Sequence, residues 1–131
     1  SGGGEQFESQ EMWRIKACLT LIDEAYKVKN AAKLAEGIRN LRLLTSCATE
    51  VSKFPYKELY FTKSHLVILN CLDPETNLGD HAVVKESLWM MSNLMLAPKQ
   101  YLTLLLEQGL VAKLARFLDV QSTHQLKSVF R

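Results

Sequence analysis

Residues that interrupt regular secondary structure are scarce in this chain. It holds three prolines and six glycines among 131 residues, and three of those glycines belong to the opening run Ser1-Gly2-Gly3-Gly4. That run resembles a cloning remnant, so residues 1–4 are set aside from the fold. The hydrophobic fraction of 47% lies in the globular range. These features favour a helical chain that is long enough to bury a sizeable core.

Charge of one sign and long apolar runs are also lacking. Sixteen Lys and Arg residues stand against 14 Asp and Glu, a net charge of +2. This balance provides neither the basic footprint of a duplex nucleic-acid binder nor a polybasic membrane signal. The apolar runs are far shorter than the roughly 20 residues of a membrane-spanning helix. We expect a protein or peptide partner and no membrane partner, with nucleic acid as the lesser alternative.

Cysteine is sparse and odd in number. Cys18, Cys47 and Cys71 are widely spaced, and each lies in a largely apolar stretch. Buried free thiols of this kind are typical of a reducing compartment. We therefore expect the protein in the cytoplasm or the nucleus.

Motifs for metal binding and catalysis are missing from the sequence. No zinc-ligand spacing relates the histidines, which are His65, His81 and His124. There is no Gly-rich phosphate loop and no Gly-x-Ser-x-Gly elbow. Asp23 and Glu24 are typical of a solvated helix face, and nothing brings Cys47 to a histidine that could act as its base. We expect no metal, no cofactor and no enzymatic activity.

Apolar residues at helical spacing predict helices over residues 8–29, 31–52 and 81–96. The three apolar stripes are Ile15, Cys18, Leu19, Ile22 and Tyr26; Leu34, Ile38, Leu41, Leu44, Ala48 and Val51; and Val84, Leu88, Met91 and Met95. Asn30 and Asp80 are candidate N-caps for the second and third of these helices. Gly37, inside the second, indicates close packing or a bend.

The remaining segments are predicted from their breakers. Residues 56–72 are rich in aromatic and β-branched residues, so this segment could also form strands. It contains no Asn-Gly or Asp-Gly turn that would join two strands, and the neighbouring helices favour a helix here as well. Residues 73–80 have a loop composition. Pro98 is expected to begin a helix that Gly109 ends, with another helix after it. Ser122 is expected to cap the start of a further helix.

Two side-chain clusters leave alternatives open. The aromatic cluster Phe54, Tyr56, Tyr60 and Phe61 is expected in the core, with a partner hot spot as the alternative. The most basic stretch comprises Lys27, Lys29, Lys33, Arg39 and Arg42. It is expected to be a solvated face with salt pairing, and a nucleic-acid contact is its alternative.

Two helix ends repeat at a fixed distance. Leu72-Asp73 and Leu118-Asp119 each close an apolar stretch, and the distance from 73 to 119 is 46 residues. This matches the roughly 40–47 residue period of HEAT and armadillo units. The segments 84–94 (VKESLWMMSNL) and 108–114 (QGLVAKL) resemble an armadillo repeat, closest to those of importin-alpha.

The resemblance implies an all-α fold, an armadillo/HEAT-like α-solenoid of stacked helices. It would be a short array with an N-terminal capping helix at 5–30, a degenerate repeat at 31–73 and a clear repeat at 80–120. Residues 121–131 would start a further helix. An incomplete end of such an array would also allow a homo-oligomer.

The resemblance further implies a peptide-binding role for Trp89 and Asn93, which stand four residues apart on one helix face. An indole offers a broad face to a cation, and an amide can hold an extended peptide backbone. Lys85, one turn earlier, opposes a lysine-rich guest. The corresponding residues of the preceding repeat are Arg39 and Leu43, so no Trp/Asn ladder is formed.

Three functional hypotheses result from these patterns. The first is a non-enzymatic scaffold or adaptor that binds a peptide or helix of a partner through Trp89, Asn93 and Lys85. The second is an importin-alpha-like receptor for nuclear-localisation peptides. The third is a helical-repeat nucleic-acid binder. The alternative for Trp89 is packing against the next unit or an unseen subunit, with Asn93 holding a backbone group of a helix or loop.

Overall fold

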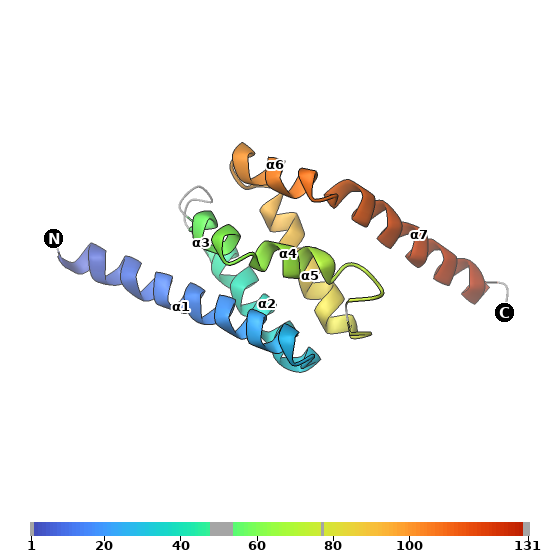
Figure 1. Cartoon of the computed structure of the whole chain (residues 1–131), viewed down its shortest axis with the longest axis horizontal. Helices are drawn as coiled ribbons and strands as arrows, with labels where there is room; N and C mark the ends of the chain where they lie inside the picture. Colours follow the sequence, from blue (N-terminus) through green and yellow to red (C-terminus); the bar gives the residue numbers. More distant parts are fainter. Residues whose placement is uncertain (1, 48–53, 77, 130–131) are drawn as a thin grey trace.

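The computed structural model describes residues 2–47, 54–76 and 78–129, and the side-chain surroundings of residues 10–46, 54–76 and 78–119. All regular structure in these ranges is helical, as the sequence predicts (Figure 1). The helices are α1 (Gly2–Lys27), α2 (Ala31–Cys47), α3 (Tyr56–Phe61), α4 (Ser64–Asn70), α5 (His81–Leu94), α6 (Lys99–Glu107) and α7 (Leu110–Val129). No helix in the described ranges combines the length and apolar character that crossing a bilayer requires.

Helices α1 and α2 form an antiparallel pair. Asn30 caps α2, since its side-chain oxygen accepts a hydrogen bond from the backbone N–H of Lys33 at 3.1 Å. The predicted stripes pack together, with Ile15, Cys18, Leu19 and Ile22 buried against Leu34, Ile38 and Leu41. Gly37 gives the close approach: a Cβ at this position would lie 2.9 Å from Cγ1 of Ile22. The predicted extension of α2 to residue 52 lies outside the described residues.

The segment 56–72 is helical, but it forms two short helices, α3 and α4, and not the single helix that was predicted. Lys63 adopts φ +60°, a left-handed conformation that ends α3 and redirects the chain into α4. The hydroxyl of Thr62 also bonds back to the carbonyl of Glu58 at 3.1 Å. Neither glycine nor proline marks this break, so the apolar pattern alone could not locate it.

Helix α5 begins as predicted, because Asp80 accepts a hydrogen bond from the backbone N–H of Val83 at 3.0 Å. Its predicted buried stripe is displaced. The buried residues are Val83, Glu86, Ser87, Met90, Met91 and Leu94, whereas Val84 and Leu88 are half-buried and Met95 is exposed. The physical reason is that α5 packs against α2 on one side and α4 on the other, so its buried face is wide and includes polar residues.

Helices α6 and α7 follow the predicted breakers. Pro98 precedes α6, and Gly109 separates α6 from α7 in a left-handed conformation with φ +88°. The expectation of a new helix at Ser122 is wrong, because α7 runs without a break from Leu110 to Val129. Ion pairs from Lys113 to Asp73 and from Arg116 to Glu75 tie α7 to the loop after α4.

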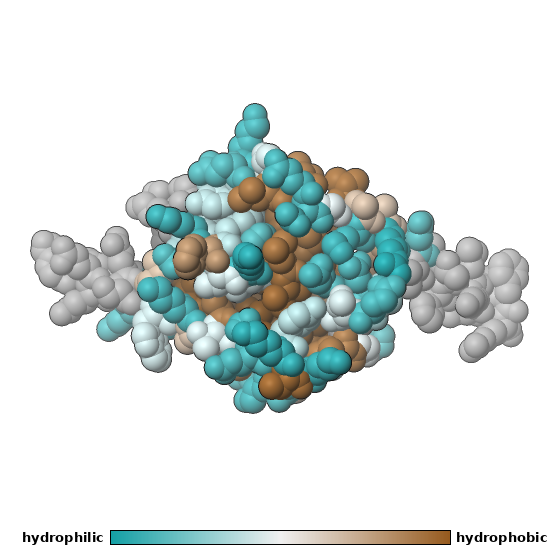
Figure 2. All heavy atoms as spheres, viewed as in Figure 1, coloured by the Kyte–Doolittle hydropathy of each residue, from teal (hydrophilic) through white to brown (hydrophobic). Residues whose placement is uncertain are grey.

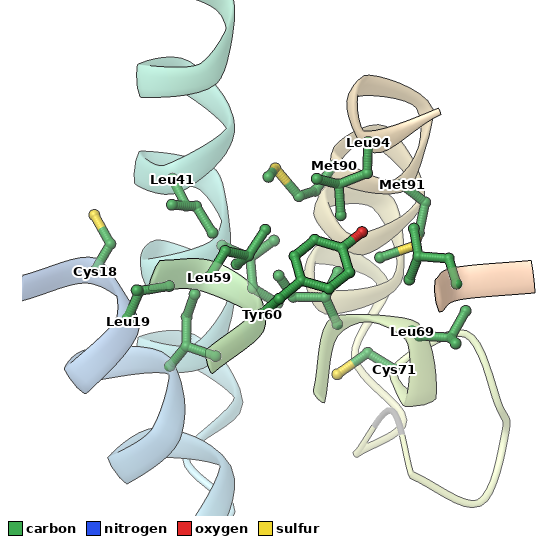
Figure 3. Packing of buried hydrophobic residues seen from close by; sticks show 14 of the residues in the cluster. Cys18, Leu19, Leu41, Leu59, Tyr60, Leu69, Cys71, Met90, Met91 and Leu94 are labelled. Atoms are coloured by element: carbon green, nitrogen blue, oxygen red, sulfur yellow. The ribbon is translucent and has the colours of Figure 1, made fainter. Parts of the chain in front are cut away.

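Helices α2 and α5 form the centre of the molecule. Side chains pair from Arg42 to Glu86, from Thr45 to Met90 and from Ser46 to Asn93. Because these residue numbers rise together, the two helices run side by side in the same direction. Side chains of α3 lie between those of α2 and α5 (Figure 3). Helices α1 and α7 lie on opposite sides of the molecule, with the chain termini at opposite ends (Figure 1).

Candidate partner-binding surface on α2 and α5

The structure brings the three predicted site residues onto one exposed strip of α5. Trp89 is 46% exposed. Lys85, one turn before it, is exposed, and Asn93, one turn after it, is half-buried. The amide nitrogen of Asn93 donates to the hydroxyl of Ser46 on α2 at 3.4 Å. Asn93 therefore contacts a side chain of the neighbouring helix and not the backbone group that the alternative interpretation expected.

Arg42 covers one face of the Trp89 indole. The central carbon of its guanidinium lies 3.7 Å from the ring centroid, a cation–π contact between α2 and α5. Trp89 thus packs against α2 with one face and remains 46% exposed. The peptide-contact role of Trp89 stays a prediction, and the indole packs against α2, which lies earlier in the chain than the next unit of the alternative interpretation.

Glu86 fixes the position of Arg42. Its two carboxylate oxygens accept hydrogen bonds from Nε of Arg42 at 2.6 Å and from Nη2 at 3.3 Å, and the two side chains are 9% and 8% exposed. A bidentate pair of this kind holds the guanidinium in one orientation. The prediction of a solvated basic face is wrong at Arg42, because its charge is buried and paired. Glu86 was not predicted at all.

The surface beside Trp89 is apolar and cationic. Leu43 of α2 is 41% exposed. Arg39 on α2 and Lys85 on α5 are both exposed, and neither forms an ion pair within the part of the chain whose side chains are described. The acidic Glu36 of α2 already pairs with Lys33 at 3.2 Å. Figure 2 shows the face on which α3 and α4 lie in front of α2 and α5, and apolar surface is exposed there between polar side chains.

The aromatic cluster is part of the core, as predicted, with one exception. Phe54, Tyr56 and Tyr60 are buried, and Tyr60 stacks on His65 with ring centroids 4.1 Å apart. Phe61 is the exception, since it is 83% exposed. Burial raises the pKa of the Tyr60 hydroxyl and lowers the pKa of the His65 imidazole. Both side chains are therefore held in their uncharged forms.

The described thiols are poor nucleophiles. Cys18 and Cys71 are buried as predicted, and burial raises the pKa of the Cys71 thiol to about 11. The side chains of Cys47 and His124 lie outside the described residues. Asp23 pairs with Lys27 at 2.9 Å on an exposed face. In the described ranges, no group of three or more His, Cys, Asp or Glu side chains is placed to hold a metal ion.

No family model, curated protein or solved structure matches this chain. The likeness to armadillo repeats therefore stays a prediction from the sequence.

Proposed function

We propose that this chain is a non-enzymatic protein-interaction module of the armadillo type. It acts as a scaffold or adaptor and binds a peptide or helix of a partner protein along the exposed strip of α2 and α5. This strip comprises Arg39, Leu43, Lys85, Trp89 and Asn93.

The parallel packing of α2 and α5 supports an α-solenoid. Neighbouring helices joined by short loops in a bundle run in opposite directions. Equivalent helices of successive repeats instead stack in the same direction, one period apart. The contacts from Arg42 to Glu86, from Thr45 to Met90 and from Ser46 to Asn93 are offset by 44, 45 and 47 residues. These offsets are close to the 46 residues between Asp73 and Asp119, although the helix end predicted at Leu118-Asp119 is wrong, because both residues lie inside α7.

The helices that follow α2 and α5 also repeat. Pro55 precedes α3 and Pro98 precedes α6, 43 residues later. A left-handed residue then separates each pair of helices, Lys63 with φ +60° between α3 and α4 and Gly109 with φ +88° between α6 and α7, 46 residues apart. Two successive units therefore share the order of long helix, proline, helix, left-handed joint and helix, which supports a stacked array.

The half-exposed indole of Trp89 is the observation that supports binding most directly. Tryptophan is enriched among the residues that dominate interface energetics. Arg42, which is itself held by Glu86, packs on one face of the indole. The Trp89 side chain is therefore already ordered, and binding a partner costs little side-chain entropy at this residue. Asn93 keeps an acceptor oxygen for a peptide backbone while its nitrogen bonds to Ser46.

A receptor for basic peptides, as in importin-alpha, has less support. Trp89 and Asn93 favour it, but Arg42 already occupies one face of the indole. Arg39 and Lys85 would repel a second cation. The carboxylate of Glu86 is already paired with Arg42.

Localisation and self-association remain predictions of the same proposal. Buried thiols favour the cytoplasm or the nucleus. The exposed Leu106, Val111 and Leu118 on α6 and α7 favour self-association, which sedimentation of the purified chain at increasing concentration would detect.

Selection of binding peptides from an unrestricted displayed library tests the proposal. The best peptides are titrated against the whole chain and against Trp89→Ala, with Trp13→Ala as the matched control, since Trp13 is also exposed but lies on α1. We expect Trp89→Ala to weaken binding by about tenfold or more and Trp13→Ala to change it by less than about threefold. Equal effects of the two substitutions, or a library that yields no binder, would refute the proposal.

A further inference from the structure

The exposed strip of α2 and α5 repeats one pattern on both helices. Arg39 and Leu43 stand four residues apart on α2, and Lys85 and Trp89 stand four residues apart on α5. Arg39 precedes Lys85 by 46 residues, and Leu43 precedes Trp89 by the same distance. Each helix therefore presents a cation one turn before a large apolar side chain, in equivalent positions of the repeat.

The charges of this strip are available to a partner. Arg39 and Lys85 form no ion pair among the side chains that the structure describes, and both are exposed. Among the side chains that the structure describes, the carboxylates of Glu86 and Glu36 are already paired, with Arg42 and Lys33. A ligand that approaches Leu43 and Trp89 thus meets the positive charges of Arg39 and Lys85.

We propose that the strip binds an acidic segment of a partner protein in which carboxylates alternate with apolar side chains. This inference rests on the proposed function and specifies its ligand. The carboxylates would pair with Arg39 and Lys85, and the apolar side chains would cover Leu43 and Trp89. Charge complementarity selects this ligand over a basic or neutral peptide.

The spacing of the two helices suggests the spacing of the ligand. Axes of packed helices lie about 8–10 Å apart, and a peptide in the polyproline II conformation advances about 3.1 Å per residue with three residues per turn. A peptide that crosses from α2 to α5 in this conformation therefore travels about three residues between the two cations, and side chains at that interval lie on the same side of the peptide. A repeated Glu-Leu-Ser triplet places its carboxylates and its apolar side chains at that interval.

A single-stranded nucleic acid would also use cations and an indole. Arg39 and Lys85 could neutralise two phosphates of a single strand. The logarithm of the binding constant would then fall with the logarithm of the salt concentration with a slope of only about −1.4, and two phosphate contacts correspond to weak binding. The observations therefore favour the acidic peptide.

The test uses the whole chain with Trp13→Phe, so that fluorescence reports on Trp89 alone. The probes are a Glu-Leu-Ser repeat peptide, the same peptide with Gln or with Lys in place of Glu, and an oligothymidylate of equal length. We expect binding of the Glu peptide alone, weakened by added salt. Arg39→Glu and Lys85→Glu should each reduce its affinity by about three- to tenfold.

Lys16→Glu is the control, because it makes the same charge change at an exposed residue of α1, outside the strip. It should leave the affinity within about twofold, and far-UV circular dichroism should show that all variants are folded. Equal or tighter binding of the Gln or Lys peptide, or of the oligonucleotide, would overturn the inference. Failure of every probe would overturn it too. Each of these outcomes contradicts the acidic ligand alone. The proposed function is tested separately, by the selection of binding peptides from an unrestricted library.

Discussion

The buried ion pair between Arg42 and Glu86 yields the most demanding prediction. Glu86→Gln removes the charge of one partner and retains its size, so the guanidinium of Arg42 stays buried without a counter-ion. Removing one member of a buried pair costs about 3–5 kcal/mol in the free energy of unfolding. A chain of 131 residues has about 7–20 kcal/mol of stability in total, so this single change would remove a large fraction of it.

Replacing both partners should restore most of that loss. In Arg42→Met with Glu86→Leu, no charge remains buried, and apolar side chains of similar volume fill the space. Such replacements are often neutral or stabilising. The double variant also loses the cation–π contact of Arg42 with Trp89, which is worth about 0.5–2 kcal/mol. We therefore expect its stability to lie within about 2 kcal/mol of the parent chain.

Urea denaturation followed by far-UV circular dichroism measures both effects. Glu36→Gln is the matched control, because Glu36 pairs with Lys33 on an exposed face of α2 with side chains 51% and 58% exposed. Its cost should stay below about 1 kcal/mol. If Glu86→Gln costs no more than Glu36→Gln, the pair is not buried as the structure describes it, and the account of how the indole is held is wrong.

Three further predictions concern local structure. Gly37→Ala should lower the free energy of unfolding by about 0.5–2 kcal/mol, because overpacking against Ile22 exceeds the gain in helix propensity, and a higher urea midpoint would contradict this. Asp80→Ala should lower the free energy of unfolding by about 0.5–2 kcal/mol, because α5 loses its N-cap, whereas Asp80→Ser should keep most of the stability that the cap provides. Equal losses of stability in thermal unfolding of the two variants would argue against capping. Burial lowers the pKa of His65 in the folded state below its ordinary value of about 6.5. The neutral imidazole therefore contributes its full stability above about pH 6.5, and this stability is lost as the pH falls below about 6.5. His65→Phe keeps a ring against Tyr60 and should therefore lose less stability between neutral and mildly acidic pH, whereas parallel pH profiles of the two chains would contradict the assignment.

Most of the helices could be predicted because the apolar residues follow one helical period in each segment. The caps at Asn30 and Asp80 and the breakers Pro98 and Gly109 act through their own backbone chemistry, so they need no tertiary information. The break at Lys63 differs from these. A lysine has no intrinsic preference for a left-handed conformation, and tertiary packing of α3 and α4 decides that it adopts one.

The candidate site was predictable only in part, for a related reason. Trp89 and Asn93 could be named from the resemblance to an armadillo repeat, and Lys85 from its place one turn earlier on the same face. Arg42 and Glu86, which hold the indole, could not be named in this way. Apolar periodicity treats every charged residue as exposed, whereas Glu86 lies on the buried face of α5.

The offset in residue number between the contacting residues of α2 and α5 contains the missing information. An offset of 46 residues relates Arg39 to Lys85 and Leu43 to Trp89, and an offset of 44 relates Arg42 to Glu86. In a stacked array, residues one period apart lie on neighbouring parallel helices, so opposite charges at that offset are candidates for a pair between units. A charged residue inside a buried stretch, with its opposite charge one period earlier, therefore predicts a buried ion pair. A charged residue with a like charge one period earlier predicts an exposed strip that a partner of the opposite charge can cover.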